Sequence, residues 1–318
     1  MTSTPPPIPG IHHVTCIAGD PQENYEFYTD TLGLRLVKRS VNQDDPTTYH
    51  LFYADAEGSP GSSMTFFPWE GMQSGRVGAG QVSTTAFRVP EGSLDFWLDR
   101  FEEQGVDHDA PVKRFGERVL PFRDPDGLPL ELVEGPDAGV PWTESVPEEA
   151  AIRGFHGVAL AVRDVGPTAE LLRTMGYTEV DGEAADDRTR FESSGDLGAV
   201  VDLVPTDREG TQGYGTVHHV AFRTPTDEDQ AAWRDSLTDL GFQPTPVIDR
   251  EWFHSVYFRG GTREANTGGV LFELATHEPG YTVDEPLDEL GSSLVLPPKF
   301  ESMRSQIEAA LQPLSTDD

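Results

Sequence analysis

Short apolar segments alternate with polar breaks along the chain, and this pattern recurs four times. Each repeat begins with a strand-like run, continues through a break rich in Pro or Asp and an amphipathic helical stretch, and ends in further strand-like runs. The repeats open with the ranges 11–33, 82–105, 155–176 and 217–241. Each helical stretch is followed by a glycine suited to a left-handed helix cap, namely Gly33, Gly105, Gly176 and Gly241.

Self-similarity of this kind indicates that one structural unit is repeated. We expect four βαβββ modules and an α+β fold whose sheets are mostly antiparallel. The predicted parts of the chain are a first domain at 8–136, a second domain at 152–278, a linker at 138–150 and a C-terminal extension at 279–318 with a helix at 299–311.

No apolar run approaches the roughly 18 residues that a membrane span needs, and the N-terminus has no pattern of a signal peptide. We therefore expect a cytoplasmic protein. Cys16 is the only cysteine, which excludes an intrachain disulfide and a cysteine metal cluster. Any metal must be bound by His, Asp and Glu.

Acidic residues dominate the charge of the chain. It carries 55 Asp and Glu residues against 23 Lys and Arg residues, for a formal net charge of -32. Such a charge repels nucleic acid and anionic membranes. We interpret it as the solvated surface of a protein from a salt-rich cytoplasm, where ionic strength screens self-repulsion. A patch for a basic partner is the alternative.

Two histidines occupy the same repeated position in the first strands of their modules. Aligning the repeats on the break after that strand places four residues in one slot: His13, Thr84, Gly157 and His219. Because side chains alternate between the faces of a strand, residues of one slot should face the same side.

A matching slot in the last strand of each repeat carries mostly acids. Its expected members are Phe66, Glu131, Asp202 and Glu273. A carboxylate in an apolar strand needs a partner, because burial of an unpaired charge is costly. A metal ion is one such partner, and hydrogen bonds or an exposed strand face are the alternative.

Only His13, His219 and Glu273 combine two histidines with a carboxylate, and they require modules one and four to share a site. A competing set replaces His13 with His156, which is out of register by one residue and should face the other side. Modules two and three offer acids without an in-register histidine, so we expect their cup to hold no metal.

Two imidazoles and one carboxylate on one face leave about three metal positions open, which suits non-heme Fe(II) that binds substrate and dioxygen together. A structural metal site would be closed by a fourth protein ligand, and the sequence offers no candidate for it.

These segments resemble the vicinal oxygen chelate superfamily, which includes glyoxalases, bleomycin-resistance proteins and extradiol dioxygenases. The stretches IHHVTCIAGDPQENYEFYTDTLG, RGFHGVAL, VHHVAF and GGVLFELATHEPGYTVDE look like those of hydroquinone-type ring-cleaving dioxygenases. The resemblance covers nearly the whole chain. It implies two cupped sheets arranged as paired barrels, and an enzyme that cleaves a hydroquinone- or catechol-type aromatic substrate with O2.

The resemblance also implies a site. Fe(II), with Mn(II) as the alternative, would be bound by the second histidine of each HH pair and a glutamate of the last strand, here His13, His219 and Glu273. The family's residues around the metal match His12, His218, Arg250 and Tyr257, with Thr15 on the strand of His13. The chain departs from the family after Tyr257, where FRGGTREANTGGV is longer than the usual turn and leaves the substrate open.

Each of these side chains also has a purely structural interpretation. His12 and His218 can be hydrogen-bonding groups between modules, Arg250 can form a surface ion pair, and Tyr257 can be strand core. His50 is predicted to be a core histidine. Three other histidines are expected near turns without a chemical role: His108, His254 and His277.

Two other functions are left open by the residues. A glyoxalase-like isomerase or lyase using Zn, Ni or Mn would need a second carboxylate, where module one offers Phe66. A small-molecule binding or resistance protein without turnover would not need an open metal site. A homo-oligomer is compatible with the sequence.

Overall fold

The computed structural model describes residues 5–69, 71–182, 187–260 and 269–316. Within these residues each predicted module has the order strand, helix and three strands. The prediction of four βαβββ modules in an α+β fold is confirmed.

Module one consists of β1 (Ile11–Ala18), α1 (Pro21–Glu26) with a π-helical turn (Phe27–Thr31), β2 (Arg35–Val41), β3 (Tyr49–Ala54) and β4 (Ser63–Pro68). Module two consists of β5 (Gln81–Pro90), α2 (Leu94–Gln104), β6 (Val112–Arg114), β7 (Glu117–Arg123) and β8 (Pro129–Gly135). Module three consists of β9 (Phe155–Val162), α3 (Val165–Thr174), β10 (Thr178–Val180), β11 (Thr189–Glu192) and β12 (Val200–Pro205). Module four consists of β13 (Thr216–Arg223), α4 (Asp227–Asp239), β14 (Ile248–Asp249), β15 (Phe253–Gly260) and β16 (Val270–Pro279).

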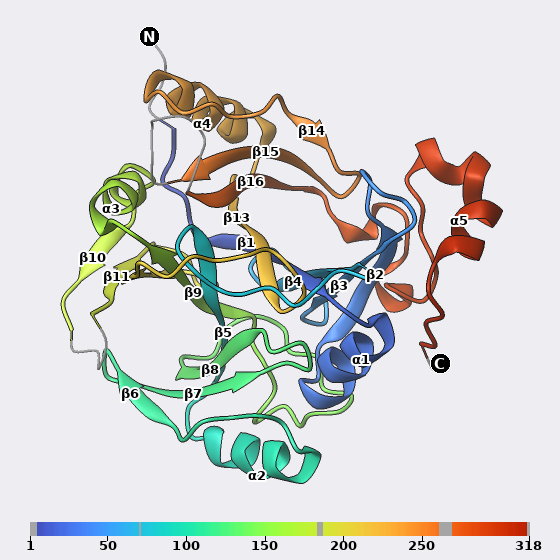
Figure 1. Ribbon diagram of the computed structural model, residues 1–318, viewed down its shortest axis with the longest axis horizontal. Coiled ribbons are helices and arrows are strands. Elements are labelled where there is room, and N and C mark those ends of the chain that lie inside the picture. The colour runs from blue at the N-terminus through green and yellow to red at the C-terminus, as the bar shows by residue number, and fades with distance from the viewer. Residues whose placement is uncertain (1–4, 70, 183–186, 261–268, 317–318) are drawn as a thin grey trace.

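The modules pair into two sheets of eight described strands each. The first sheet joins modules four and one in the order β14-β15-β16-β13-β1-β4-β3-β2, and the second joins modules three and two in the order β10-β11-β12-β9-β5-β8-β7-β6. Figure 1 shows both sheets curling into cups, with the helices α1 to α4 on the outside. The predicted pair of cupped sheets is confirmed. Because each sheet draws one module from each half of the chain, the division into domains 8–136 and 152–278 stays a prediction.

The ends of the helices follow from local side chains and glycines. Asp20 caps α1 by accepting hydrogen bonds from the backbone N–H groups of Gln22 and Glu23, which satisfies donors that the first helical turn leaves free. The four predicted cap glycines all have positive φ angles, namely Gly33, Gly105, Gly176 and Gly241. No helix of the described segments is long and apolar enough to span a membrane.

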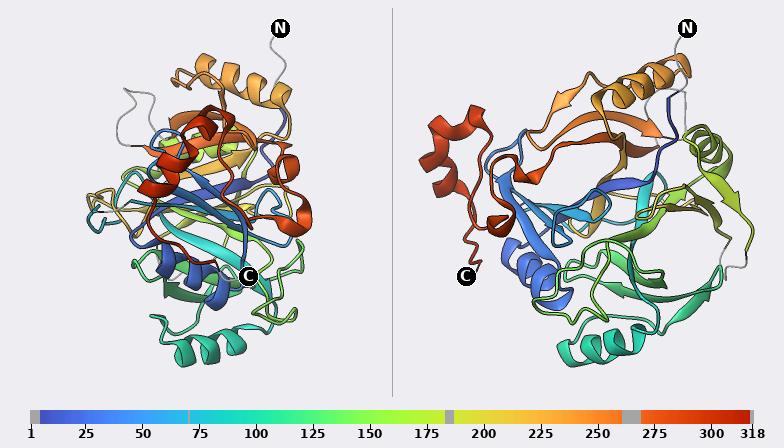
Figure 2. Two further views of the ribbon diagram at one scale, coloured as in Figure 1. Left: turned by 90° about the vertical axis from the view of Figure 1, so that its right-hand side faces the viewer. Right: turned by 180° about the vertical axis from the view of Figure 1, so that it is seen from behind.

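The C-terminal extension lies against the β2 edge of the first sheet, which Figures 1 and 2 show from three sides. Its last part is a 3-10 helix (Pro298–Met303) followed by α5 (Arg304–Ala310). The predicted helix at 299–311 is confirmed in extent, although its first part is a 3-10 helix. The two helices meet at Met303, whose backbone lies at φ -108° and ψ 4°.

A buried lysine fastens this extension. Lys38 of β2 is fully buried, and its Nζ lies 2.5 Å from Asp284 Oδ1, 2.5 Å from Glu285 Oε2 and 3.1 Å from the Tyr281 carbonyl oxygen. Asp284 also accepts a 2.7 Å hydrogen bond from the indole N–H of Trp252. The ammonium group of Lys38 thus holds the extension against the first sheet.

Candidate metal centre and substrate pocket

The strand register supports the predicted histidine slot. β1 and β13 run antiparallel at the centre of the first sheet, and His13 lies opposite the residue two beyond His219. In the second sheet Thr84 of β5 lies opposite the residue two beyond Gly157 of β9. The two sheets therefore carry the same slot, filled by imidazoles in one and by small side chains in the other.

Three of the four last strands carry an acid in the matching slot. Glu273 of β16 lies beside the residue two beyond His219. Asp202 of β12 and Glu131 of β8 hold the same place in modules three and two. The acid slot is thus confirmed for these three modules.

In module one this slot belongs to Thr65. The residue two beyond His13 is Thr15, and Thr15 pairs with Thr65 of β4. The assignment of Phe66 is therefore wrong by one residue. Phe66 instead packs on Tyr28 beneath the helical layer, with 4.5 Å between ring centroids. Because every residue of β4 is buried, the sequence shows no alternation that could have fixed this register.

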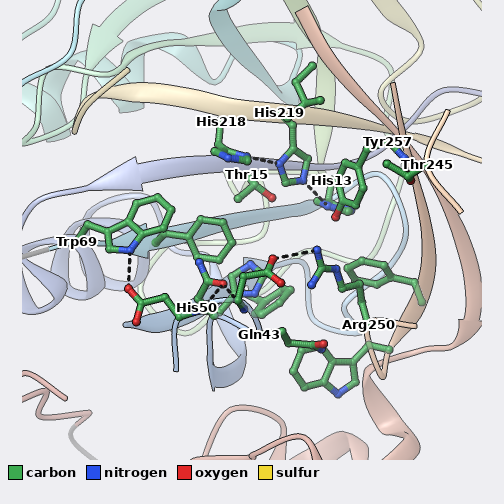
Figure 3. A pocket seen from close by; sticks show the side chains of 18 residues that line it. His13, Thr15, Gln43, His50, Trp69, His218, His219, Thr245, Arg250 and Tyr257 are labelled. Atoms are coloured by element: carbon green, nitrogen blue, oxygen red, sulfur yellow. Dashed lines mark hydrogen bonds and ion pairs between the residues drawn. The ribbon is translucent and has the colours of Figure 1, made fainter. Parts of the chain in front are cut away.

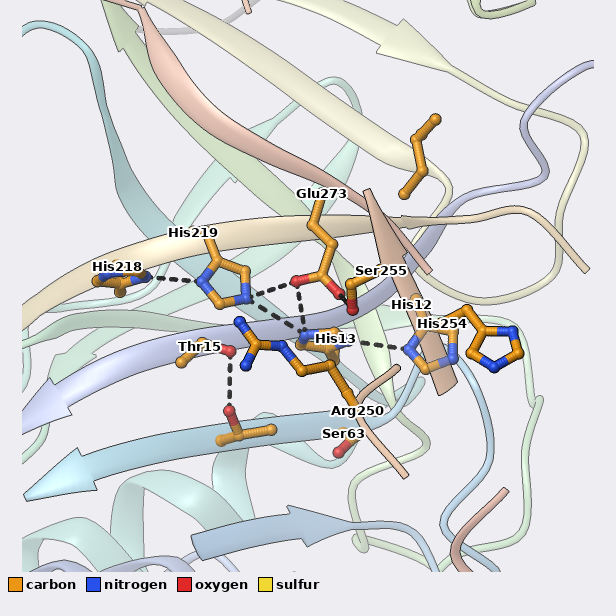
Figure 4. A network of polar contacts seen from close by, with 12 residues as sticks. His12, His13, Thr15, Ser63, His218, His219, Arg250, His254, Ser255 and Glu273 are labelled. Atoms are coloured by element: carbon orange, nitrogen blue, oxygen red, sulfur yellow. Dashed lines mark hydrogen bonds and ion pairs between the residues drawn. The ribbon is translucent and has the colours of Figure 1, made fainter. Parts of the chain in front are cut away.

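The structure brings the predicted triad together from strands of modules one and four. His219 Nε2 lies 2.8 Å from Glu273 Oε2, and His13 Nε2 lies 3.4 Å from the same oxygen and 3.4 Å from His219 Nε2. All three side chains are buried. Figure 4 shows the two imidazoles and the carboxylate converging on one point, and the three ligand atoms lie within 4.8 Å of one another.

The electrostatics of this cluster fit a divalent cation. Burial alone would raise the pKa of Glu273, but the neighbouring His13 and His219 rings hold that pKa well below its ordinary value. Although Glu273 Oε2 is close to both imidazoles, it is buried without a hydrogen-bond partner of suitable geometry among the described residues. A metal ion would satisfy this oxygen and both Nε2 atoms, because two imidazoles and a carboxylate are its usual ligands.

Each histidine of this triad is paired with the histidine before it. His13 Nδ1 lies 2.9 Å from His12 Nδ1, and His219 Nδ1 lies 2.8 Å from His218 Nδ1. If Nε2 binds a metal, Nδ1 carries the proton and donates a hydrogen bond to the preceding ring. Burial, followed by the charge of His219, lowers the pKa of His218 to about 3, and burial and His13 lower the pKa of His12. Both preceding rings are therefore neutral acceptors.

A cavity of about 410 Å³ opens beside this cluster, and Figure 3 shows the side chains that line it. Much of its wall is apolar and comes from six side chains: Phe52, Phe67, Trp69, Trp252, Phe253 and Leu271. Cavities of this size and character are typical of small-molecule sites. His13 and His219 line it, so the metal position faces the space where a flat apolar ligand would lie.

The other predicted site residues divide between the cavity and its surroundings. His218, Arg250 and Tyr257 line the cavity. Tyr257 lies edge-on to His219 with 5.5 Å between ring centroids, and the Arg250 guanidinium lies 5.7 Å above the Tyr257 ring. Burial and the charge of Glu273 raise the pKa of Tyr257. His12 does not line the cavity and packs against Phe253.

The competing ligand set fails on topology. His156 lies in the second sheet, whereas modules three and four share no sheet. The acids of that second cup are paired with arginines. Glu131 accepts a 2.6 Å hydrogen bond from Arg114, and Asp202 accepts one of 2.8 Å from Arg190.

Two functional neighbours were missed by sequence reasoning. Ser255 of β15 is buried and donates a 2.5 Å hydrogen bond to Glu273 Oε1. His50, predicted to be core, lines the cavity. Neither side chain is marked by a sequence motif, because each is brought to the site by the pairing of its strand with the next one. His254 and His277 lie close to the ends of β15 and β16, which agrees with their predicted placement near turns.

The long segment between Tyr257 and Glu273 is only partly described. β15 ends at Gly260 and β16 begins at Val270. Residues 261–268 lie outside the described residues, so the effect of this longer segment on the choice of substrate is still open.

Comparison with known proteins gives consistent likenesses. Residues 10–132 and 179–274 match the model of the Glyoxalase/Bleomycin resistance protein/Dioxygenase superfamily. The chain is 45% identical over 309 residues to the "Putative ring-cleaving dioxygenase MhqO" of Bacillus subtilis, covering 96% of each protein. It is 31% identical over 320 residues to the "Chlorohydroquinone/hydroquinone 1,2-dioxygenase" of Sphingobium indicum, covering 96% of this chain and 97% of that protein.

A solved crystal structure has the same fold throughout. It is that of a "putative dioxygenase" from Bacillus subtilis, which superposes with a TM-score of 0.92 at 43% sequence identity. The match covers 98% of this chain and 99% of that one. The likeness therefore includes both cups and the C-terminal extension.

Proposed function

Because the chain belongs to the Glyoxalase/Bleomycin resistance protein/Dioxygenase superfamily, we propose that it is a metal-dependent ring-cleaving dioxygenase. Its metal would be Fe(II), with Mn(II) as the alternative, and its substrates O2 and a hydroquinone- or catechol-type aromatic ring. Two relatives that align over nearly the whole chain carry ring-cleaving or hydroquinone dioxygenase names.

One observation carries this proposal. His13, His219 and Glu273 converge beside the cavity, and Glu273 Oε2 has no hydrogen-bond partner of suitable geometry among the described residues. These three side chains would hold the metal on one face. When bound, Fe(II) supplies the open coordination positions and the electron relay that dioxygen chemistry on an aromatic ring requires.

The residues around the metal position would orient the ring. The aromatic wall formed by Phe52, Phe67 and Trp252 can hold a flat ring and exclude water from it. Tyr257 and Arg250 face the same space, so they can donate hydrogen bonds to an oxygen on which negative charge develops.

His12 and His218 would have different roles. His218 lines the cavity, so its Nε2–H can donate a hydrogen bond to a substrate oxygen while its Nδ1 orients His219. His12 lies behind His13 and faces Phe253 instead of the cavity. We therefore propose that His12 acts through the orientation and tautomer of His13, as a positioning residue.

The test is oxygen uptake by protein loaded anaerobically with Fe(II), Mn(II), Zn(II) or no metal, mixed with hydroquinone or catechol. We expect about one equivalent of O2 for each equivalent of diol consumed, only with Fe(II) or Mn(II). Glu273→Gln should abolish uptake. Glu131→Gln, which alters the matching slot of the second cup, should retain it.

Three results would replace this function with another. Uptake that survives Glu273→Gln places the chemistry elsewhere. Isomerisation of a thiol adduct with Zn(II), without oxygen, favours a glyoxalase-like isomerase. Diol binding without any metal or turnover favours a binding protein.

A further inference from the structure

His50 is held in a fixed orientation on the wall of the cavity. Its ring lies 3.9 Å from that of Phe52 and 4.4 Å from that of Phe67, centroid to centroid. Its Nε2 lies 3.0 Å from Thr65 Oγ1. The ring is therefore positioned by packing on two aromatic side chains and by one hydrogen bond, which is how a preorganised binding group is built.

Thr65 makes this arrangement specific to the first cup. It stands in module one where the other three modules carry a carboxylate, and it is fully buried. Its hydroxyl also lies 2.9 Å from Thr15 Oγ1. Since a hydroxyl has one proton, Thr65 donates to one partner and accepts from the other. Thr15, Thr65 and His50 thus form a hydrogen-bonded chain, and both of its ends line the cavity.

The second ring nitrogen of His50 is left for a ligand. Burial, followed by the charges of His13 and His219, lowers the pKa of His50 well below its ordinary value. A neutral imidazole has one donor and one acceptor nitrogen. Thr65 engages Nε2, and no described residue forms a hydrogen bond with Nδ1. Nδ1 can either donate or accept, depending on the direction in which the chain runs.

Other polar groups on this side of the cavity are already engaged. Three of them come from the loop between β2 and β3, and each already has a side-chain partner. These contacts are Gln43 with Lys299, Asp44 with Arg250 and Asp45 with Trp69. Figure 3 shows His50 across the cavity from His13 and His219.

We propose that His50 binds the substrate hydroxyl that is not on the metal, through Nδ1, and that Thr65 holds it in place for this contact. The inference rests on the proposed function, in which one oxygen of a dihydroxylated ring occupies the metal position. The second oxygen then enters a largely apolar cavity, where an unpaired hydroxyl would be unfavourable. His50 would thereby select rings with two hydroxyl groups over rings with one.

The experiment is anaerobic equilibrium binding of phenol, catechol and hydroquinone to Fe(II)-loaded protein. We expect either catechol or hydroquinone to bind about tenfold more tightly than phenol, which is the effect of one good hydrogen bond. His50→Phe keeps a flat ring in the aromatic stack and should weaken that diol about tenfold while leaving phenol unchanged. Thr65→Val should reduce the preference in the same direction. His254→Phe, on the same sheet outside the cavity, is the matched control and should change nothing.

Each alternative result has a distinct meaning. An unchanged diol preference in His50→Phe, or an equal loss for phenol and diol, overturns the proposal and leaves His50 a packing residue. Absence of any diol preference in the unaltered protein overturns it as well. Failure of all three ligands to bind counts against the proposed function itself, and the role of His50 falls with it.

Discussion

Ser255 Oγ lies 2.5 Å from Glu273 Oε1, and both side chains are fully buried. The hydroxyl donates to Oε1, and Oε2 points toward the two imidazoles, as Figure 4 shows. The arrangement fixes a carboxylate that offers one oxygen to a metal. Hydrogen bonds of this kind orient ligands and commonly change metal affinity severalfold or more.

Ser255→Ala should therefore weaken Fe(II) and Mn(II) binding by roughly 10- to 100-fold. Competition with a chromophoric chelator would measure it. Ser83→Ala removes a hydroxyl that bonds a backbone carbonyl in the second sheet, and it should leave the affinity unchanged. Equal metal affinity in Ser255→Ala and the unaltered protein would refute a positioning role for Ser255.

His12 and His218 should differ when each is replaced by Phe. His12→Phe should weaken metal binding by roughly 10-fold or more but leave KM for the diol unchanged once metal is saturating, because His12 lies outside the cavity. His218→Phe should alter both quantities, because His218 lines the cavity. A changed KM in His12→Phe with unaltered metal affinity would contradict this assignment.

Asp124 should make stability depend on pH. Burial raises its pKa from 3.8 to about 7, although its carboxylate accepts hydrogen bonds from Leu128 N and Tyr28 Oη. Between pH 3.8 and about pH 7 the folded protein keeps a proton on Asp124 that the unfolded chain has released. The free energy of unfolding therefore falls as the pH rises through this range.

Asp124→Asn should remove this fall in stability with rising pH. Relative to the unaltered protein, the variant should gain up to roughly 4 kcal/mol between pH 4 and pH 8, at about 1.36 kcal/mol for each pKa unit. Urea unfolding across this range would measure it, with the exposed Asp99→Asn as control. Parallel curves for Asp124→Asn and the unaltered protein would show that Asp124 does not titrate in this window.

Lys38→Met should release the C-terminal extension. The change leaves Glu285 buried without its cation, and loss of one partner of a buried pair costs about 3–5 kcal/mol. We expect lower stability in urea and faster proteolytic cleavage within 279–318. Lys113→Met, at an exposed position of β6 in the second sheet, is the control. Unchanged cleavage of the extension in Lys38→Met would show that other contacts hold it.

The repeat pattern carried most of the fold, because each βαβββ module has its own strand-like runs, amphipathic helix and cap glycine. The pairing of modules one and four followed from chemistry, since only His13, His219 and Glu273 together form a ligand set. These features are local or are marked by rare residues, so the sequence displays them directly.

What the sequence could not show depends on packing. Thr65 and Phe66 are both fully buried, so burial did not distinguish the cavity face from the helix face, and the slot was placed one residue too late. Ser255 and His50 have ordinary sequence surroundings, and their roles emerge only when β15 meets β16 and β3 meets β4. The Lys38 clamp joins residues 246 positions apart, which no local pattern predicts.

Mass analysis of the product formed under ¹⁸O2 tests the central claim most directly. Fe(II)-loaded protein with hydroquinone or catechol should yield an opened-ring product that contains both oxygen atoms of one O2 molecule, and His13→Ala should yield none. A product without the label, or diol recovered unchanged from protein whose metal occupancy has been verified, would contradict a dioxygenase built on His13, His219 and Glu273.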